Sequence, residues 1–341
     1  MKTCIIGASG YSGQVLVELL IQHPSVELVT VTSRQNEGRK VGEVIPKIAH
    51  RARDLTFTNP TINELTNSEC EVFFLALPHG TAASFALPLL EAGKKVIDLS
   101  ADFRLNNPDT YEEFYDAKHP SSEWLKKAQY GLPEIHSFNW ETTPLIASPG
   151  CYPTSILIPL CPLLQDDLIE IEDITANCIS GISGAGKSAS ERLLFCERNE
   201  SAGSYGIPKH RHLSEIEEQL SLFAGEKVII SFIPHLAPMN RGICSTITVK
   251  PKGRLSRDLI LQSWEKFYSE RVFVNILEEG KQPGVADVVG TNRIDLNVSA
   301  DPRTNKYIIC SAEDNLIKGA GGQAVQSLNL CLGIAEDTGL L

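Results

Sequence analysis

The stretch Thr3-Cys4-Ile5-Ile6-Gly7-Ala8-Ser9-Gly10-Tyr11-Ser12-Gly13 decides the fold of the first third of the chain. Residues 3–6 are apolar and predict a short strand, and residues 14–22 show the apolar spacing of a helix. The glycines between them follow G-x-x-G-x-x-G rather than the commoner G-x-G-x-x-G. Glycines at such a junction let the backbone approach a pyrophosphate, which rests on the helix N-terminus. The stretch predicts a dinucleotide-binding loop, with a chance turn as the alternative.

Strand and helix patterns continue to alternate beyond this loop. Residues 26–32, 72–77 and 95–99 predict further strands, and 82–92 predict a helix that ends before Gly93. Strands that alternate with helices indicate a parallel, doubly wound sheet of the α/β class.

The end of the second predicted strand indicates which dinucleotide is bound. An NAD site usually has an acidic residue there, about 20 positions after the glycines, to hold the ribose 2′-hydroxyl. This chain has Ser33 and Arg34 instead. A hydroxyl and a guanidinium suit a 2′-phosphate, so the sequence predicts NADP(H) as cofactor. A solvated loop charge is the alternative for Arg34.

Composition limits the classes of protein to consider. The 341 residues suit two domains, and 31 basic against 42 acidic residues give a net charge of -11. That balance argues against a nucleic-acid or anionic-membrane surface, and no stretch has the length of a membrane span. The 9 cysteines form no C-x-x-C pair. We therefore expect a reducing, cytoplasmic environment and no metal site.

A second strand-to-helix junction carries a cysteine. Residues 145–147 predict a strand, Pro149-Gly150 predict a turn, and residues 154–164 look helical. A helix start favours negative charge, which lowers the pKa of a thiol from about 8.5 toward neutrality. Cys151 is therefore a candidate nucleophile. A buried structural cysteine is the alternative, and Pro159 and Pro162 suggest a short or kinked helix.

A second glycine-rich segment, Gly181 to Ser188, matches the pattern G-x-x-x-x-G-K-[ST]. A strand-like run at 174–179 precedes it, and a helical run is predicted at 189–196. A nucleoside-triphosphate site is one interpretation. However, the strand predicted at 228–233 ends in Pro234-His235 rather than in an Mg²⁺-binding Asp. In the simpler interpretation, Ser183 and Lys187 hold a carboxylate or an acyl-phosphate group.

Two histidines precede a predicted helix. Ser214 resembles its N-cap, and residues 215–223 show helical spacing, so His210 and His212 would lie in the preceding loop. Histidine transfers protons near neutral pH, and Glu215 is close enough in the chain to orient the His212 ring. The neighbouring Lys209 and Arg211 favour anion binding or proton transfer over a solvated loop.

Together these residues describe an acyl-phosphate reductase. A thiolate expels phosphate to form a thioester, and hydride transfer then releases an aldehyde. The chain also resembles the N-acetyl-γ-glutamyl-phosphate reductase family of arginine biosynthesis, within the aspartate-semialdehyde-dehydrogenase-like superfamily. The motifs that carry this resemblance span nearly the whole chain: GASGYSG at 7–13, LALPHG at 75–80, IDLSADFRL at 97–105, YGLPE at 130–134, SPGCYPT at 148–154, SGISGAGKS at 180–188, KHRHLSEIE at 209–217, PHLAPMNRG at 234–242 and DNLIKGAGGQAVQSLNL at 314–330.

The resemblance implies a role for each matching residue. Cys151 would be the acylated nucleophile and the His210/His212 pair the general acid–base, with His212 preferred. The substrate would be bound by Arg104, Ser183, Lys187, Arg211, Glu215 and Arg241. The cofactor would be bound by Gly7, Ser9, Gly10, Tyr11, Ser12, Gly13, Ser33, Arg34, Pro78, His79 and Asn315.

The resemblance also implies the domain layout and the assembly. Residues 1–148 and 313–341 would form a Rossmann-type NADP-binding domain, and 149–312 an α+β catalytic and dimerisation domain with a mixed or antiparallel sheet. A homodimer or homotetramer would act on a small acyl phosphate. A reductase of another acyl phosphate, such as aspartyl phosphate or a carrier-linked aminoadipyl phosphate, remains an alternative, as does a P-loop enzyme.

Overall fold

The chain folds into two compact units in the computed structural model, which describes residues 1–340. One unit comprises Met1–Pro149 together with the segment that begins at Ala320, and the other comprises Gly150–Gly319. No helix among the described residues is long and apolar enough to cross a bilayer. The assignment of functions to 1–148, 149–312 and 313–341 stays a prediction.

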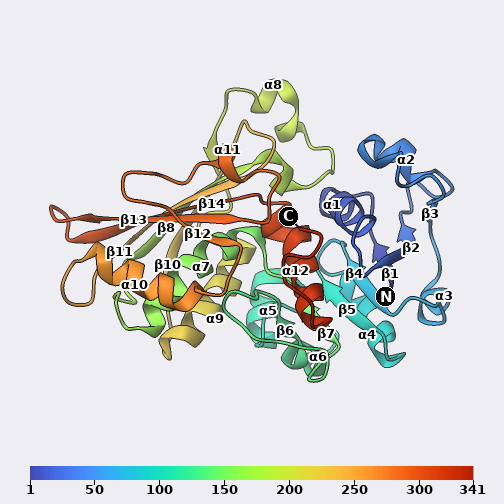
Figure 1. The fold of residues 1–341 in the computed structure, drawn as a ribbon, viewed down its shortest axis with the longest axis horizontal. Coiled ribbons are helices and arrows are strands. Elements are labelled where there is room, and N and C mark those ends of the chain that lie inside the picture. The colour runs from blue at the N-terminus through green and yellow to red at the C-terminus, as the bar shows by residue number, and fades with distance from the viewer. Residues whose placement is uncertain (341) are drawn as a thin grey trace. The chain divides into compact units, whose positions relative to one another are not determined.

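The first unit is built on a parallel sheet in the order β3-β2-β1-β4-β5-β7-β6 (Figure 1). Every neighbouring pair of these strands, within residues 1–340, is parallel. The strands are β1 (Lys2–Ile6), β2 (Glu27–Thr32), β3 (Phe57–Thr58), β4 (Val72–Leu75), β5 (Lys95–Asp98), β6 (Gln129–Tyr130) and β7 (Leu145–Ala147).

Helices cover both faces of this sheet because successive side chains of a strand point to opposite sides. Ile5 of β1 packs into a core with Leu16 and Val325, whereas Cys4 and Ile6 pack into another core that includes Ala86. The helices of the unit are α1 (Tyr11–Leu20), α2 (Val41–Val44), α3 (Ile62–Thr66), α4 (Ala82–Glu91), α5 (Pro108–Tyr115), α6 (Ser122–Lys127) and α12 (Gly322–Cys331).

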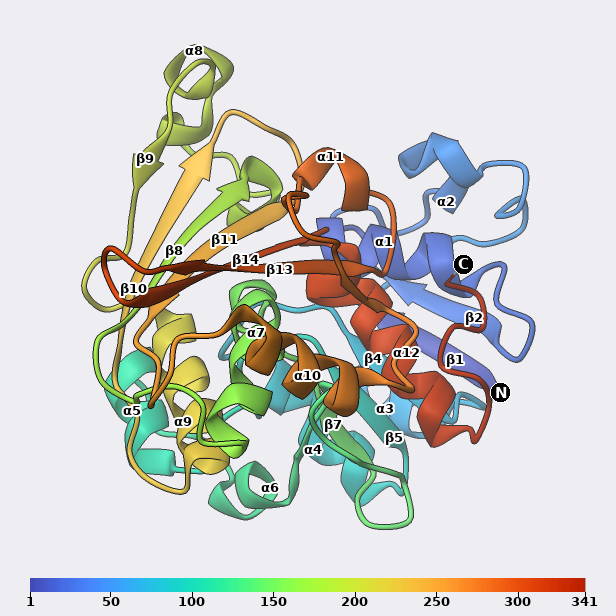
Figure 2. The ribbon, with the colours of Figure 1, turned by 60° about the vertical axis from the view of Figure 1, so that its left-hand side comes forward.

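The second unit contains a mixed sheet in the order β12-β13-β14-β11-β8-β10-β9 (Figure 2). Its strands are β8 (Ile174–Gly181), β9 (Gly203–Ser204), β10 (Ile230–Ala237), β11 (Ile243–Val249), β12 (Val274–Ile276), β13 (Ile294–Asp301) and β14 (Lys306–Glu313). The pairs β8–β10 and β12–β13 are parallel and the other pairs are antiparallel. The predicted fold class, a doubly wound sheet plus an α+β unit with a mixed sheet, is confirmed.

Three helices of the second unit pack against its sheet: α7 (Cys151–Gln165), α9 (Arg211–Ala224) and α10 (Arg257–Tyr268). The shorter α8 (Phe195–Arg198) and α11 (Val285–Val288) lie in the connections between strands. A π-helical turn, Ile317–Gly321, follows β14.

Helix α7 is longer than predicted and continues through both internal prolines. A proline removes the N–H that would bond the carbonyl four residues earlier. The carbonyl that Pro159 leaves open, on Ser155, accepts the Ser311 hydroxyl at 2.7 Å instead. The carbonyl that Pro162 leaves open, on Ile158, accepts the Tyr268 hydroxyl. Tertiary hydrogen bonds therefore replace the missing helical ones, so the expectation of a short helix is wrong.

Other predicted boundaries also shift. Helix α1 begins at Tyr11 rather than at residue 14, and β10 runs through Pro234 to Ala237 instead of ending there. The helix predicted at 189–196 is wrong, because this stretch forms a short 3₁₀ turn and the four-residue α8. Its apolar side chains have no core to pack against: Leu194 is 56% and Phe195 78% exposed.

Candidate active site

The glycine loop of the first unit has the close backbone contacts that its sequence predicts. Gly7 has a φ of +88°, and a Cβ there would lie 2.3 Å from the Ala76 carbonyl oxygen. A Cβ on Gly13 would lie 2.3 Å from the Gly7 carbonyl oxygen. At Gly10 the nearest atom, the Gly7 carbonyl oxygen, would be 3.8 Å away, which is an ordinary van der Waals contact. The loop is therefore fixed by contacts at Gly7 and Gly13 and is not crowded at Gly10.

The surroundings of this loop suit a phosphorylated ligand. Gly10 is the N-cap of α1, no side chain caps it, and the first turn has no acidic residue. The Ser33 hydroxyl donates to the Ser9 hydroxyl at 2.8 Å, and Arg34 is exposed. Tyr11 is 38% exposed and Ser12 is half-buried. Hydroxyls, a guanidinium and an uncapped helix start thus lie at the carboxyl ends of β1 and β2.

A buried carboxylate that the sequence analysis missed holds the Pro78–His79 loop. Asp102 is fully buried and accepts hydrogen bonds from Gly80 N at 2.6 Å and Ala83 N at 3.0 Å. It therefore caps the start of α4 from a distant part of the chain. Pro78 and His79 are exposed next to this cap, and the His79 ring lies 5.9 Å from the Tyr115 ring.

Arg104, a predicted substrate ligand, has several contacts inside the first unit. Its Nε donates to the Ser148 carbonyl and its Nη2 to the Leu99 carbonyl, each at 2.8 Å. Only 8% of the residue is exposed. These bonds fix the chain three residues before Cys151, so Arg104 supports the turn that leads to the cysteine.

Cys151 is the first residue of α7 and is partly exposed. Gly150 caps the helix in an extended conformation, and its N–H donates to Glu215 Oε1 at 2.8 Å. Glu215 is 1% exposed, so this predicted substrate ligand supports the cysteine turn from below the surface. Gly319 lies against the other side, because a Cβ there would be 2.8 Å from Cys151 Cβ and 3.1 Å from Glu313 Oε1.

Both predicted histidines lie at the start of α9, which corrects the expected boundary at Ser214. The helix begins at Arg211, and His210 is its N-cap through Nδ1, which accepts from His212 N at 3.0 Å. A histidine ring thus replaces the hydroxyl cap that we expected from Ser214. The two rings lie 5.0 Å apart, and burial, followed by the charge of Arg211, lowers the pKa of His210 to about 4.

Two tyrosines surround His210. Tyr152, next to Cys151 in the chain, packs edge-on against His210 and His212 at 5.8 and 6.0 Å between ring centroids. The Tyr205 ring lies 5.4 Å from His210, and its hydroxyl donates to the Tyr152 hydroxyl at 3.1 Å. Burial raises the pKa of Tyr205 to about 12 and raises the pKa of Tyr152 further. The sequence analysis missed Tyr205, which no motif marked.

The remaining predicted ligands of the second unit form two groups. Lys187 and Arg211 are exposed, whereas Ser183 and Arg241 are partly buried. Arg241 pairs with the fully buried Asp314 at 3.0 Å. Asn315, predicted to bind the cofactor, donates to Ser183 Oγ at 3.0 Å and accepts from Gly242 N at 2.7 Å. The structure therefore brings Ser183, Arg241 and Asn315 together through residues at the end of β14.

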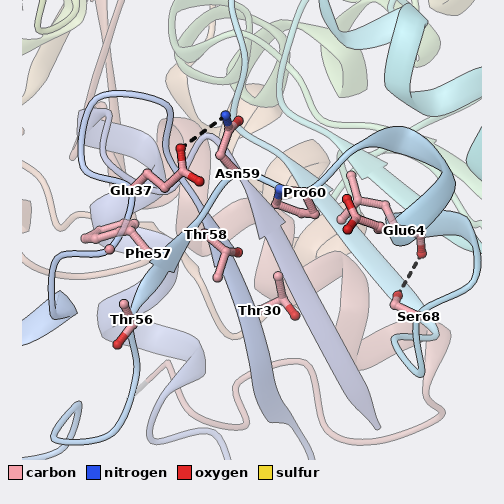
Figure 3. Close-up of a pocket in the computed structure, with 11 residues that line it drawn as sticks. Thr30, Glu37, Thr56, Phe57, Thr58, Asn59, Pro60, Glu64 and Ser68 are labelled. Carbon is pink, nitrogen blue, oxygen red and sulfur yellow. Dashed lines mark hydrogen bonds between the residues drawn. The ribbon is translucent and has the colours of Figure 1, made fainter.

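A cavity of about 550 Å³ lies elsewhere in the first unit, at the β3 edge of the parallel sheet (Figure 3). Thr30, Thr58 and Pro60 line it, and Glu37 and Asn59, which also line it, are joined by a hydrogen bond of 3.5 Å. None of the predicted site residues lines this cavity.

Comparison with protein families defines the class. Residues 2–142 match the model described as semialdehyde dehydrogenase, NAD binding domain, and residues 151–315 match semialdehyde dehydrogenase, dimerisation domain. Solved structures agree on the fold. The aspartate semialdehyde dehydrogenase II of Vibrio cholerae complexed with ASA has a TM-score of 0.73 at 16% identity, covering 97% of this chain and 98% of that one. The fold and the matched domains are those of the semialdehyde dehydrogenases.

Curated relatives show to which family of this class the chain belongs. The N-acetyl-gamma-glutamyl-phosphate reductase of Akkermansia muciniphila is 49% identical over 100% of this chain and 98% of its own. Proteins of the same name from Desulfotalea psychrophila and Moorella thermoacetica are 45% and 44% identical, with the same coverage. The chain therefore belongs to the N-acetyl-γ-glutamyl-phosphate reductase family.

Proposed function

We propose that the protein reduces N-acetyl-γ-glutamyl phosphate to N-acetylglutamate 5-semialdehyde with NADPH, releasing phosphate, as a step of arginine biosynthesis. The observation that carries the proposal is full-length identity of 49% to a reductase of that name, in a chain that starts α7 with Cys151. The position of Cys151 at the start of a helix suits a nucleophile that must react as a thiolate.

We propose Cys151 as the nucleophile. It occupies the first position of a 15-residue helix whose first turn contains no acidic residue. The partial positive charge of a helix N-terminus stabilises a thiolate. The thiolate forms a C–S bond with the acyl carbon of the substrate, the C–O bond to phosphate breaks, and phosphate leaves with the electron pair. The product of this step is a thioester on Cys151.

The proposed cofactor fits the first unit. The uncrowded backbone at Gly10 and the uncapped start of α1 suit a pyrophosphate, and the hydroxyl of Ser33 beside Arg34 suits a 2′-phosphate. When bound, NADPH would supply the hydride to the thioester carbon, and breakage of the C–S bond would release the aldehyde and return the thiolate of Cys151. We propose Gly7, Ser9, Gly10, Tyr11, Ser12, Gly13, Ser33, Arg34, Pro78 and His79 as its contacts. For Asn315 we propose a positioning role instead, because both ends of its amide are already bonded.

We propose that His212 transfers the proton. The leaving phosphate takes up a proton in the forward reaction, so a side chain of the site must supply it. The pKa of His210 is lowered to about 4, which keeps this ring neutral at pH 7. Its Nδ1 is also engaged as the cap of α9. His210 therefore shapes the start of the helix, and His212 at the second position of α9 remains as the acid.

We propose that the substrate's two anionic groups are bound by Ser183, Lys187, Arg211 and Arg241. For Glu215 we propose a supporting role instead, because its carboxylate accepts the Gly150 N–H just before Cys151. Arg104 supports the preceding chain, because its Nε donates to the Ser148 carbonyl. Guanidinium and ammonium groups recognise carboxylates and phosphates through charge-assisted hydrogen bonds.

We also propose that two copies of the chain associate through the outward face of the second sheet. Strands β8, β10 and β11 contain no Lys, Arg, Asp or Glu, and their outward side chains include Ile179, which is 44% exposed. An exposed sheet face without charge marks an interface. Light scattering should give a homodimer or a larger assembly, and Ile179→Glu should shift it to monomer.

We propose a cytoplasmic location, because none of the nine cysteines forms a disulfide bond.

The proposed function is tested by the reverse reaction. Purified protein should reduce NADP⁺ when given N-acetylglutamate 5-semialdehyde and phosphate, and should do so much faster than with aspartate semialdehyde. Cys151→Ser should lower the rate by about 10³-fold or more while NADP⁺ binding stays within about twofold. Wild-type rates in the serine variant would contradict the mechanism, and equal rates with both aldehydes would contradict the substrate.

A further inference from the structure

We propose that Asp314 is a positioning residue that sets the direction in which Arg241 presents its guanidinium to an anionic group of the substrate. The inference rests on the proposed function and deepens it, since neither the sequence motifs nor the relatives assign a role to Asp314. Asp314 also connects the proposed anion-binding residue Arg241 to the backbone that packs against Cys151.

Asp314 receives hydrogen bonds from several parts of the second unit although it is 0% exposed. Its Oδ1 accepts from Arg241 Nη2 at 3.0 Å and Nε at 3.3 Å, and from the N–H groups of Leu316 and Ile317 at 2.8 and 3.2 Å. Its Oδ2 accepts from Gly290 N at 2.8 Å. The carboxylate is therefore held by backbone on both oxygens and can act as a fixed point for Arg241.

Arg241 keeps donors for a ligand. Its side chain is 26% exposed, whereas that of Asp314 is 0% exposed, so the ion pair has one accessible end. Nε and Nη2 bond Asp314 Oδ1, and Nη1 has no hydrogen-bond partner within residues 1–340. A guanidinium is a planar fork, so fixing one edge fixes the direction of the remaining N–H groups.

The backbone of Arg241 is also immobilised, which leaves only its side chain to be oriented. A Cβ on Gly181 would lie 2.7 Å from Arg241 N, and Gly181 N donates to the Gly242 carbonyl at 2.9 Å. The neighbouring Ser183 N donates to the Asn240 carbonyl at 3.1 Å. Residues 239–242 thus pack closely against the end of β8. The side chain of Arg241 is the part that can still change direction, and Asp314 holds it.

The same residue reaches the cysteine through the turn that follows it. The carbonyl of Asp314 accepts from Gly319 N at 2.9 Å, and Gly319 lies directly against Cys151. One buried residue therefore organises both the guanidinium and the backbone that packs on the nucleophile. A purely structural cap of the 314–319 turn is the competing explanation, and it predicts no selective effect on the substrate.

The test measures the reverse reaction of the full-length enzyme carrying Asp314→Asn. We expect the KM for N-acetylglutamate 5-semialdehyde or for inorganic phosphate to rise about tenfold or more, with kcat changed less than about threefold and the KM for NADP⁺ unchanged. A rise for the aldehyde substrate identifies its carboxylate as the bound group, and a rise for phosphate identifies the phosphoryl group. Unchanged values for both would overturn the inference.

Two further variants exclude a merely structural effect. Asp295→Asn is the matched control, because Asp295 is 2% exposed and pairs with Arg293 at 2.7 Å, yet touches no proposed ligand of the substrate. It should leave all three KM values unchanged. In an Arg241→Gln background, Asp314→Asn should add less than about twofold, because the two residues act as one unit. An undiminished rise in that background would overturn the inference.

The outcomes separate this inference from the proposed function. A wild-type enzyme without activity on the acetylated semialdehyde would overturn both, whereas an active wild type with an unaffected Asp314→Asn variant overturns only the positioning role. If Asp314→Asn does not fold, Asp314→Glu keeps the charge and moves it by one methylene. The same selective KM rise is expected there, and wild-type KM values in that variant would overturn the inference.

Discussion

Two strand-to-helix junctions of this chain look alike locally and differ in what faces the helix start. Gly10 caps α1 and Gly150 caps α7, with nearly the same backbone angles: φ is -71° at both, and ψ is 168° and 157°. Neither helix has an acidic residue in its first turn. At Gly10 a Cβ would make only an ordinary contact of 3.8 Å with the Gly7 carbonyl oxygen, whereas the N–H of Gly150 is bonded to the buried Glu215.

The comparison shows that a glycine-capped helix start can have two functions, binding an anionic ligand or holding a nucleophile. An uncapped helix start whose backbone is not crowded can receive an anion from solution. A helix start that carries its own thiol needs its preceding backbone held in place, and Glu215 and Arg104 hold the two sides of that turn. We infer that the first junction is built for a ligand and the second for a nucleophile.

The largest effect that separates the two junctions is expected within the glycine loop. Gly13→Ala places a Cβ 2.3 Å from the Gly7 carbonyl oxygen and should lower the free energy of unfolding by about 3 kcal/mol. In Gly10→Ala the new Cβ lies no closer than 3.8 Å to another group, so the free energy of unfolding should change by less than about 0.5 kcal/mol. The Gly10 variant should nevertheless bind NADP⁺ about tenfold more weakly, because its methyl group occupies the space for the pyrophosphate.

Urea unfolding and fluorescence titration with NADP⁺ measure these two effects separately. Wild-type affinity in Gly10→Ala would remove the ligand role that we assign to the first junction.

The next effect concerns the pH dependence of stability at the His210 cap. The pKa of His210 is lowered from 6.5 to about 4 in the folded protein, chiefly by burial. Between these values the unfolded chain binds more protons, so the free energy of unfolding should fall as the pH drops from 6.5 to 4, by at most about 3 kcal/mol. His210→Asn keeps a capping side chain and removes this titration.

Urea unfolding of both proteins across that pH range is the measurement. The wild-type curve should be steeper than that of His210→Asn, and the other histidines cancel in the difference. Parallel curves would show that His210 does not titrate as a buried cap.

A smaller effect is expected at the cap of the cysteine turn. Glu215→Gln retains an acceptor for Gly150 N but loses its charge, so the free energy of unfolding should fall by about 1 kcal/mol. Glu217→Gln is the control on the same helix, because Glu217 accepts from Ile230 N at 3.1 Å and is only half-buried. Equal losses in both variants would remove the special role of Glu215.

The sequence predicted what local patterns determine. Glycine spacing, apolar periodicity and the strand at 145–147, which the structure reproduces as β7, follow from short-range rules. The predicted starts of α7 and α9 were wrong, since α7 begins at Cys151 and α9 at Arg211, and the continuation of α7 through its prolines was not predicted. Ser311 and Tyr268 donate hydrogen bonds to the carbonyls that the two prolines of α7 leave open. The His210 ring caps α9 in place of the Ser214 hydroxyl. Such partners are not visible in a local pattern.

The candidate site shows the same division. Cys151, His210 and His212 lie in marked motifs, and the structure places all three in one unit. Asp102 and Asp314 lie inside quoted motifs too, yet their importance depends on which backbone groups face them after folding. Tyr205 lies outside every motif, and its contact with Tyr152 joins residues 53 positions apart. Long-range polar contacts of this kind need the fold itself.

The most direct measurement asks whether Cys151 carries the acyl group. Enzyme mixed with NADP⁺ and N-acetylglutamate 5-semialdehyde, without phosphate, should form NADPH in a burst of about one per site and then stop. Mass spectrometry of the quenched enzyme should find an N-acetylglutamyl thioester on the peptide that contains Cys151, and none in Cys151→Ser. A burst with the acyl group on another residue, or steady turnover in the serine variant, would contradict the account.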